Sequence, residues 1–139
     1  MNREKMEKKN DKNGLMTSFV VGMDIIPEIV DAKQNDKNMK MVMEEWNLGP
    51  EEASEDPTAN KEYWAKMARV WNITEPEARR QMCANCEYFQ NSPVFMEAME
   101  DIPMNKYDMD GGGRGYCKKF DFICHNLRTC QAWDKGHDY

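Results

Sequence analysis

Leucine, isoleucine, valine and phenylalanine are scarce in this sequence. Leu, Ile, Val and Phe together make up 20 of its 139 residues, and only three of these are leucines. This share, about 14%, lies below the roughly 20% at which a well-filled apolar core is expected. Thirteen methionines and four tryptophans replace part of the missing bulk, but methionine fills gaps without specifying one packing arrangement. We therefore expect another kind of group to fix the fold.

Long apolar runs and an excess of basic charge are also missing. No stretch approaches the roughly 18 apolar residues of a transmembrane helix, so we expect no membrane span. The apolar run at 14–23 follows a basic segment but is short and lacks a small-residue cleavage site, which predicts an unexported, cytoplasmic protein. The net charge of −6 argues against a dedicated nucleic-acid binder, because phosphate contacts require a basic face.

Familiar catalytic motifs are absent as well. No serine lies in a nucleophile elbow, and the adjacency of Cys124 and His125 in sequence does not establish a nucleophile and base pair. The glycines at 111–115 lack the lysine and hydroxyl residue of a phosphate-binding loop. The sequence therefore offers no argument for an enzyme.

The chain divides into two predicted parts near residue 56. Residues 1–56 comprise a charged tail, an apolar docking segment at 15–30 and an acidic linker. Within this part an apolar stripe at intervals of three and four residues predicts a helix over 31–46, formed by Met39, Val42, Met43 and Trp46. Residues 57–139 comprise a helical lead-in and a cysteine-rich, iron-sulfur-like domain.

Caps and apolar stripes predict three short helices in the second part. Asp56 and Pro57 predict the start of a helix over 57–71, with an apolar stripe of Tyr63, Trp64, Met67, Val70 and Trp71. Thr74 and Glu77 form a capping box, and Ser92 precedes a third helix. We find no strand-like alternation, and 103–115 is predicted to be a loop. The expected fold is small, metal-dominated and mostly irregular, with short α-helices and a helical N-terminal extension.

Five cysteines stand at positions 83, 86, 117, 124 and 130. In a reducing compartment an odd number favours metal binding over a disulfide framework. Zinc gathers its sulfurs on one atom, which commonly favours two close cysteine pairs, whereas a four-iron cluster offers one iron to each thiolate. Only Cys83 and Cys86 form a close pair, so the spacing favours an iron-sulfur cluster. A zinc site, including a mixed one that uses Cys124 and His125, remains an alternative.

The surroundings of the cysteines carry a family resemblance. Residues 83–89 read CANCEYF, residues 115–120 read GYCKKF and residues 129–133 read TCQAW. This series resembles the high-potential iron-sulfur proteins over residues 83–136. The resemblance implies one 4Fe-4S cluster, one-electron transfer and a redox partner protein. It also implies the cluster ligands Cys83, Cys86, Cys117 and Cys130 and an aromatic pocket wall of Tyr88, Phe89, Tyr116, Phe120 and Trp133.

The sequence departs from the pattern of that family at two points. Thirty residues separate Cys86 from Cys117, about twice the usual gap in the family, and Cys124 has no counterpart. The chain also resembles small uncharacterised proteins of marine tailed bacteriophages. The alternative role is a structural or interaction protein, in a virion or another larger assembly, in which the metal only staples the fold. The first 80 residues, with an apolar segment and an acidic stretch suited to docking, support this alternative.

Overall fold

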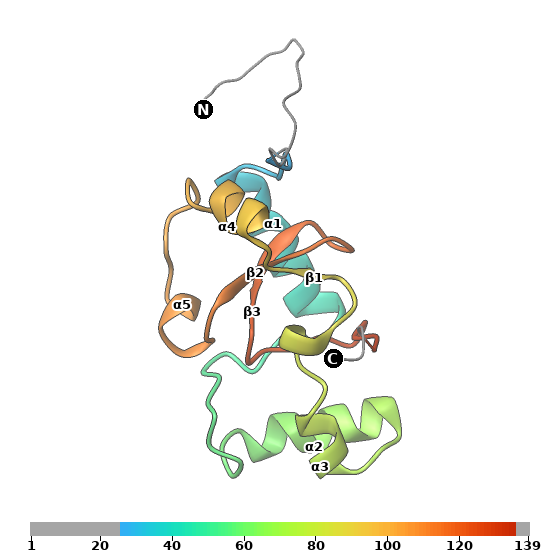
Figure 1. Cartoon of the computed structure of the whole chain (residues 1–139). Helices are drawn as coiled ribbons and strands as arrows, with labels where there is room; N and C mark the ends of the chain where they lie inside the picture. Colours follow the sequence, from blue (N-terminus) through green and yellow to red (C-terminus); the bar gives the residue numbers. More distant parts are fainter. Residues whose placement is uncertain (1–25, 136–139) are drawn as a thin grey trace.

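The computed structural model describes residues 26–135, which form a mixed α/β fold (Figure 1). The helices are α1 (Ala32–Glu45), α2 (Lys61–Trp71), α3 (Glu75–Arg79), the 3-10 turn η1 (Cys83–Asn85), α4 (Pro93–Met99) and α5 (Tyr107–Asp110). The strands are β1 (Phe89–Gln90), β2 (Arg114–Cys117) and β3 (Phe122–His125). The predicted tail, and the docking segment up to residue 25, lie outside the described residues.

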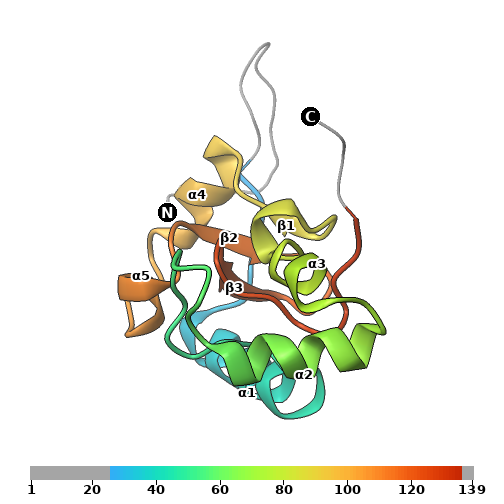
Figure 2. The same cartoon turned by 90° about the horizontal axis from the view of Figure 1, so that it is seen from below.

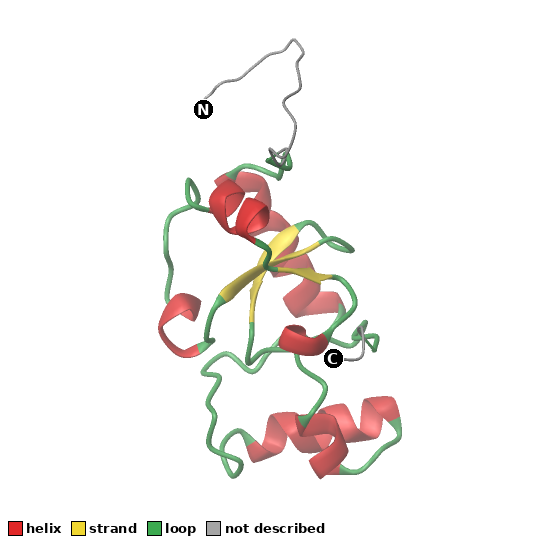
Figure 3. Cartoon of the chain, viewed as in Figure 1, coloured by secondary structure: helices red, strands yellow, loops and turns green. Residues whose placement is uncertain are grey.

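The three strands form one antiparallel sheet in the order β1-β2-β3 (Figure 3). The sequence analysis predicted short helices, which is confirmed, but it missed the sheet. The reason lies in β3, which is buried at all four positions and so shows no apolar and polar alternation. A fold of short helices around a small sheet therefore replaces the mostly irregular one that was predicted.

Helix α1 confirms the prediction for 31–46 and packs directly on the sheet. The Asp31 side chain accepts a hydrogen bond from the Gln34 amide at 2.8 Å and caps the helix. The buried Asn35 side chain accepts one from the Ile123 amide of β3 at 2.6 Å. Met39 and Val42 share a core cluster with Phe122 and the buried cysteines. This helix is a layer of the core rather than an appended extension.

Helices α2 and α3 form a hairpin with its own small core of Trp64, Met67, Ala68 and Ala78. Helix α2 begins at Lys61 and not at 57, because the Asp56 carboxylate accepts hydrogen bonds from the amide and hydroxyl of Thr58 instead. Val70 is 40% exposed, so its predicted place in the apolar stripe is wrong. The predicted capping box of α3 is confirmed, since Thr74 and Glu77 bond reciprocally through their side chains and amides.

The sheet lies between α4 on one face and α1 on the other (Figure 2). Alternate residues of a strand face opposite sides, and the two core clusters follow this rule. Tyr116 and Ile123 pack with Met99 of α4, while Cys117, Phe122 and Cys124 pack toward α1. Helix α4 starts after Ser92 as predicted, whereas the predicted loop at 103–115 contains α5 and the start of β2.

Candidate metal centre

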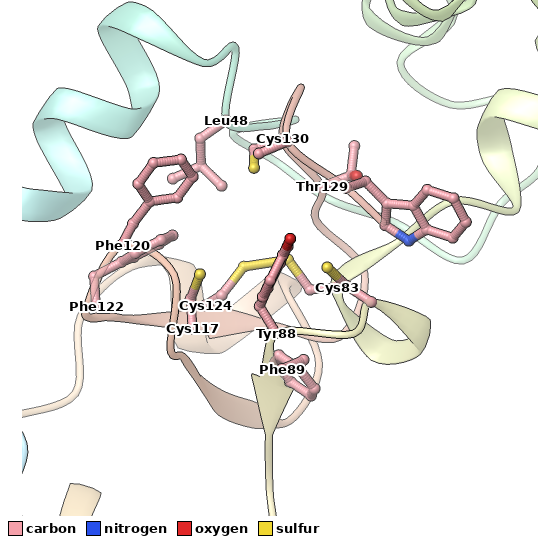
Figure 4. A pocket seen from close by; sticks show the side chains of 13 residues that line it. Leu48, Cys83, Tyr88, Phe89, Cys117, Phe120, Phe122, Cys124, Thr129 and Cys130 are labelled. Atoms are coloured by element: carbon pink, nitrogen blue, oxygen red, sulfur yellow. A yellow bond between two sulfur atoms is a disulfide. The ribbon is translucent and has the colours of Figure 1, made fainter. Parts of the chain in front are cut away.

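One apolar pocket brings together cysteines and aromatic rings from distant parts of the chain (Figure 4). The picture shows Cys117, Cys130 and Tyr88 directed into the same space, with the Cys83–Cys124 bond beside them. The pocket is lined by Leu48, Cys83, Cys86, Tyr88, Phe89, Cys117, Phe120, Phe122, Cys124, Thr129, Cys130, Ala132 and Trp133. All five cysteines of the chain are among these residues.

The structure places most of the residues predicted for the site around this pocket. The four cysteines that the resemblance implied as ligands line it, and so do Tyr88, Phe89, Phe120 and Trp133. Tyr116 does not, because it lies on the opposite face of β2 and stacks on Phe95 with ring centroids 6.0 Å apart. His125 does not either, since its side chain points away from that of Cys124 in the fully buried strand β3.

Hydrogen bonds fix the turn that carries Cys83 and Cys86. The Cys83 amide donates to the Arg128 carbonyl at 2.6 Å, and the Cys86 amide donates to the Cys83 carbonyl at 3.0 Å. The Asn85 side chain accepts from the Met82 amide at 3.1 Å and donates to the Arg80 carbonyl at 2.7 Å. The indole of Trp133 donates to the same Asn85 oxygen at 2.9 Å. The pair is therefore held against the last segment of the described chain.

The other cysteines are held by main-chain pairing. Cys117 ends β2, and its carbonyl accepts the Asp121 amide at 2.8 Å to close the turn into β3. Asp121 adopts φ 55°, a left-handed conformation that an aspartate tolerates. Near Cys130, Thr129 exchanges two backbone hydrogen bonds with Gly49, at 2.7 and 3.0 Å. This pairing brings Leu48 into the pocket wall.

Burial keeps two of the free thiols in their neutral form. It raises the pKa of Cys117 to about 11, although backbone hydrogen bonds from Phe120 and Lys119 to its sulfur act in the opposite direction. It also raises the pKa of Cys130 to about 12, against a backbone hydrogen bond from Ala132. Cys86 raises the pKa of both thiols through its charge. The three sulfurs are thus close enough to repel one another as thiolates, which a bound cation would relieve.

Cys83 and Cys124 form a disulfide across 41 positions of sequence, whereas Cys86, Cys117 and Cys130 are free. The sequence analysis favoured metal binding over disulfides and did not anticipate this bond. Cys83 is therefore a cysteine of the pocket whose sulfur is already bonded. A ligand role for Cys83 requires that this bond be reduced.

Residues 26–135 contain no group of three or more His, Cys, Asp or Glu that could hold a metal ion. They also contain no helix with the length and apolar character needed to cross a membrane. A single zinc requires all sulfurs at about 2.3 Å from one atom, whereas a four-iron cluster binds each sulfur at a different corner. The absence of a group that could hold a metal ion therefore concerns the single-zinc geometry, in which all ligands meet at one atom.

Four residues of the pocket wall were missed from the sequence. Leu48 belongs to the segment after α1 and Phe122 to the unrecognised strand β3, while Thr129 and Ala132 flank Cys130. The apolar run from Phe122 to Cys124 was the available signal, because a short unbroken apolar run is consistent with a fully buried strand. Leu48 carried no comparable signal.

A second buried polar cluster lies at the other end of β2 and β3, and His125 belongs to it. The His125 Nε2 atom lies 2.7 Å from the Asp108 carboxylate. Arg114 donates five hydrogen bonds, two to Asp108 and three to the carbonyls of Met99, Ile102 and Pro103. Burial opposes ionisation of Asp108, but the bonds from Arg114, the Asn105 amide and His125 together lower its pKa to about 2.

Function resides in the residues of a site rather than in the fold, and here those residues are the cysteines and aromatic side chains that line the pocket. Comparison with known proteins found no family model, no curated protein and no solved structure that matches this chain.

Proposed function

We propose that this protein binds one 4Fe-4S cluster through Cys83, Cys86, Cys117 and Cys130 and transfers single electrons to and from a redox partner protein. The observation that carries the proposal is that every cysteine of the chain lines one pocket whose remaining wall is almost entirely apolar. Four thiolates are the usual protein complement of such a cluster. When bound, the cluster supplies a one-electron couple whose potential depends on burial, net charge and hydrogen bonds to sulfur.

The donor set of the pocket fits this group. Backbone hydrogen bonds from Lys119, Phe120 and Ala132 already reach the sulfurs of Cys117 and Cys130. Such bonds stabilise negative charge on sulfur in an environment where burial disfavours it. The Tyr88, Phe89, Phe120 and Trp133 side chains exclude water from the same sulfurs.

Phe89 is packed tightly on the sheet beside the sulfurs. Its ring lies on Gly115 of β2 so closely that a Cβ atom at that position would overlap it. Glycine at 115 thus lets the ring approach the pocket wall. This supports the assignment of Phe89 to the wall that the family resemblance implied.

The ligand role of Cys83 requires reduction of its bond to Cys124. A dithiol supplies the two electrons and two protons, so that the S–S bond breaks, two thiols form and the dithiol becomes a disulfide. Cys83 then completes the ligand set, and Cys124 remains as the spare thiol. We assign Cys83 rather than Cys124 because Cys83 and Cys86 lie on one short turn, as the two cysteines of a Cys-x-x-Cys pair.

The proposal is tested by anaerobic reconstitution of the full chain with iron, sulfide and a dithiol reductant. The expected product is brown, with broad visible absorption that bleaches on one-electron reduction. A colourless protein that instead retains stoichiometric zinc after purification would refute the cluster. Repeating the measurement on Cys83→Ser and Cys124→Ser assigns the fourth ligand, since only the ligand variant loses the colour.

A second candidate is a structural role, in the cytoplasm or in a virion, with a cluster or zinc as a staple. The observation in its favour is that Cys83 and Cys124 share a core cluster with Met39 and Val42 of α1. A group bound there would join α1, the sheet and the last segment. Voltammetry separates the candidates, because a reversible couple favours electron transfer. An electrochemically inert site, together with stable incorporation into a larger assembly, favours the staple.

A further inference from the structure

The turn between β2 and β3 carries a lysine that lies over two rings of the pocket. The Lys119 Nζ atom is 5.1 Å from the centroid of the Tyr88 ring and 5.7 Å from that of Phe120. Both rings belong to the pocket wall and are visible in Figure 4. Ammonium groups within about 6 Å of a ring face are attracted by it. The Lys119 charge is therefore held at the edge of the cysteine pocket although the residue is exposed.

The neighbouring lysine provides an internal comparison. Lys118 lies in the same turn and is equally exposed, but its side chain contacts no ring and forms no ion pair within residues 26–135. Its backbone amide, not its side chain, binds the Tyr88 carbonyl at 2.9 Å. The two lysines carry the same charge at adjacent positions and differ in whether that charge is anchored beside the pocket.

The position of Lys119 has an electrostatic consequence inside the pocket. The two rings over which the Lys119 ammonium lies also line the pocket, so its charge lies beside the cysteine sulfurs. A positive charge that stabilises a thiolate also stabilises any further negative charge added nearby. One-electron reduction of a bound cluster adds such a charge.

We infer that Lys119 is a positioning residue of the proposed redox site, whose ammonium, held over Tyr88 and Phe120, raises the reduction potential of the bound cluster. The inference rests on the proposed function, and it deepens that function by naming a residue that sets the potential without touching the cluster. Removal of the charge should therefore favour the oxidised state and lower the potential.

The test is the reduction potential of the cluster-loaded full chain in the variants Lys119→Met, Lys118→Met and Lys119→Arg. Methionine keeps most of the apolar stem and removes the charge, whereas arginine keeps the charge and stacks on rings. We expect Lys119→Met to shift the ratio of oxidised to reduced protein by up to about tenfold, which corresponds to about 59 mV for one electron. The Lys118→Met shift should be less than half as large, and Lys119→Arg should stay near wild type.

The outcomes separate this inference from the proposed function. A wild-type chain that assembles no cluster would refute both the proposed function and the role of Lys119. If the wild-type chain assembles a cluster but Lys119→Met and Lys118→Met have equal reduction potentials, only the role of Lys119 is refuted. A second readout needs no cluster: ring currents of Tyr88 and Phe120 should move the NMR signals of the Lys119 ε-methylene upfield of those of Lys118. Tyr88→Leu should reduce this difference, and identical signals in wild type would overturn the geometry.

Discussion

Strands β2 and β3 carry two buried polar sites that satisfy their polar groups in different ways. At one end of the strands, Arg114 and Asp108 form an ion pair. Arg114 uses all five donors of its guanidinium in hydrogen bonds to Asp108 and to backbone carbonyls. In the cysteine pocket, two half-buried thiols accept only backbone hydrogen bonds, and their charges would repel one another if both were ionised. At the first site Arg114 and Asp108 are paired with each other, whereas the buried Nδ1 atom of His125 has no hydrogen-bond partner among residues 26–135. The second has the chemistry of a site for a positively charged metal group.

The largest effect is expected in the cysteine pocket, where substitution of a proposed ligand and substitution of Cys124 should have different results. Cys117→Ser or Cys130→Ser should abolish cluster assembly, because each removes a thiolate that the proposal requires. Cys124→Ser should retain the cluster, and it also frees Cys83 from the disulfide. Iron and acid-labile sulfide content per chain measures the result. Equal cluster content in all three variants would contradict the ligand assignment.

Next in size is a loss of stability at the Arg114 site. Asp108→Ala leaves the guanidinium of Arg114 and the imidazole of His125 without their carboxylate. Removing one partner of a buried ion pair costs about 3–5 kcal/mol, and urea unfolding should show a decrease of this order. The exposed Asp110 provides the control, since Asp110→Ala should stay within about 0.5 kcal/mol of wild type. A similar loss of stability in both variants would show that Asp108 contributes no more to stability than an exposed aspartate does.

The pKa values predict opposite pH responses for the two sites. The folded-state pKa values of Cys117 and Cys130 are raised to about 11 and about 12. Above about pH 8.5 the unfolded chain therefore loses these protons first, so the stability of the reduced, metal-free protein falls as pH rises toward 11. The Asp108 pKa is lowered to about 2, so its contribution is present above about pH 4 and is lost as pH falls toward 2.

Denaturant unfolding across the pH range checks both responses. The double variant Cys117→Ser/Cys130→Ser should flatten the alkaline decline and leave the acid decline unchanged. Asp108→Asn should instead flatten the acid decline and leave the alkaline decline unchanged. An alkaline decline of the same steepness in the double variant would mean that other groups, such as the half-buried Tyr63, whose pKa is also raised, are responsible.

The smallest effect is expected in the α2 and α3 hairpin, which has a core separate from the pocket. Thr74→Ala removes the side-chain cap of α3 and should cost about 1 kcal/mol. Cluster content should not change, because no residue of α3 lines the pocket. A loss of cluster in this variant would show that the hairpin and the pocket are coupled.

Helices with clear end signals were predictable from the sequence. Thr74 and Ser92 each precede a helix as expected, and the helix predicted over 31–46 begins one residue later, at Ala32, because end signals and apolar stripes are local features. The start of α2 was not predictable in this way. The Asp56 carboxylate accepts hydrogen bonds from Thr58 and does not cap a helix at 57. Asn60 adopts a left-handed conformation immediately before the helix.

The misplaced site residues share one cause, the unrecognised sheet. Because no strand was predicted, the Tyr116 side chain was expected beside that of Cys117, and the His125 side chain beside that of Cys124. In a strand, adjacent side chains face opposite sides, so Tyr116 and His125 lie away from the pocket that the cysteines line. The disulfide was missed for another reason, because an odd number of cysteines in a chain expected to be cytoplasmic favoured metal binding over disulfides.

The central claim is most directly tested by iron and acid-labile sulfide analysis of the anaerobically reconstituted full chain, combined with Mössbauer spectroscopy. The account predicts about four irons and four sulfides per chain in a single cubane, the composition of a 4Fe-4S cluster. A protein that takes up no iron and sulfide under these conditions, while zinc binds stoichiometrically to the same cysteines, would contradict it.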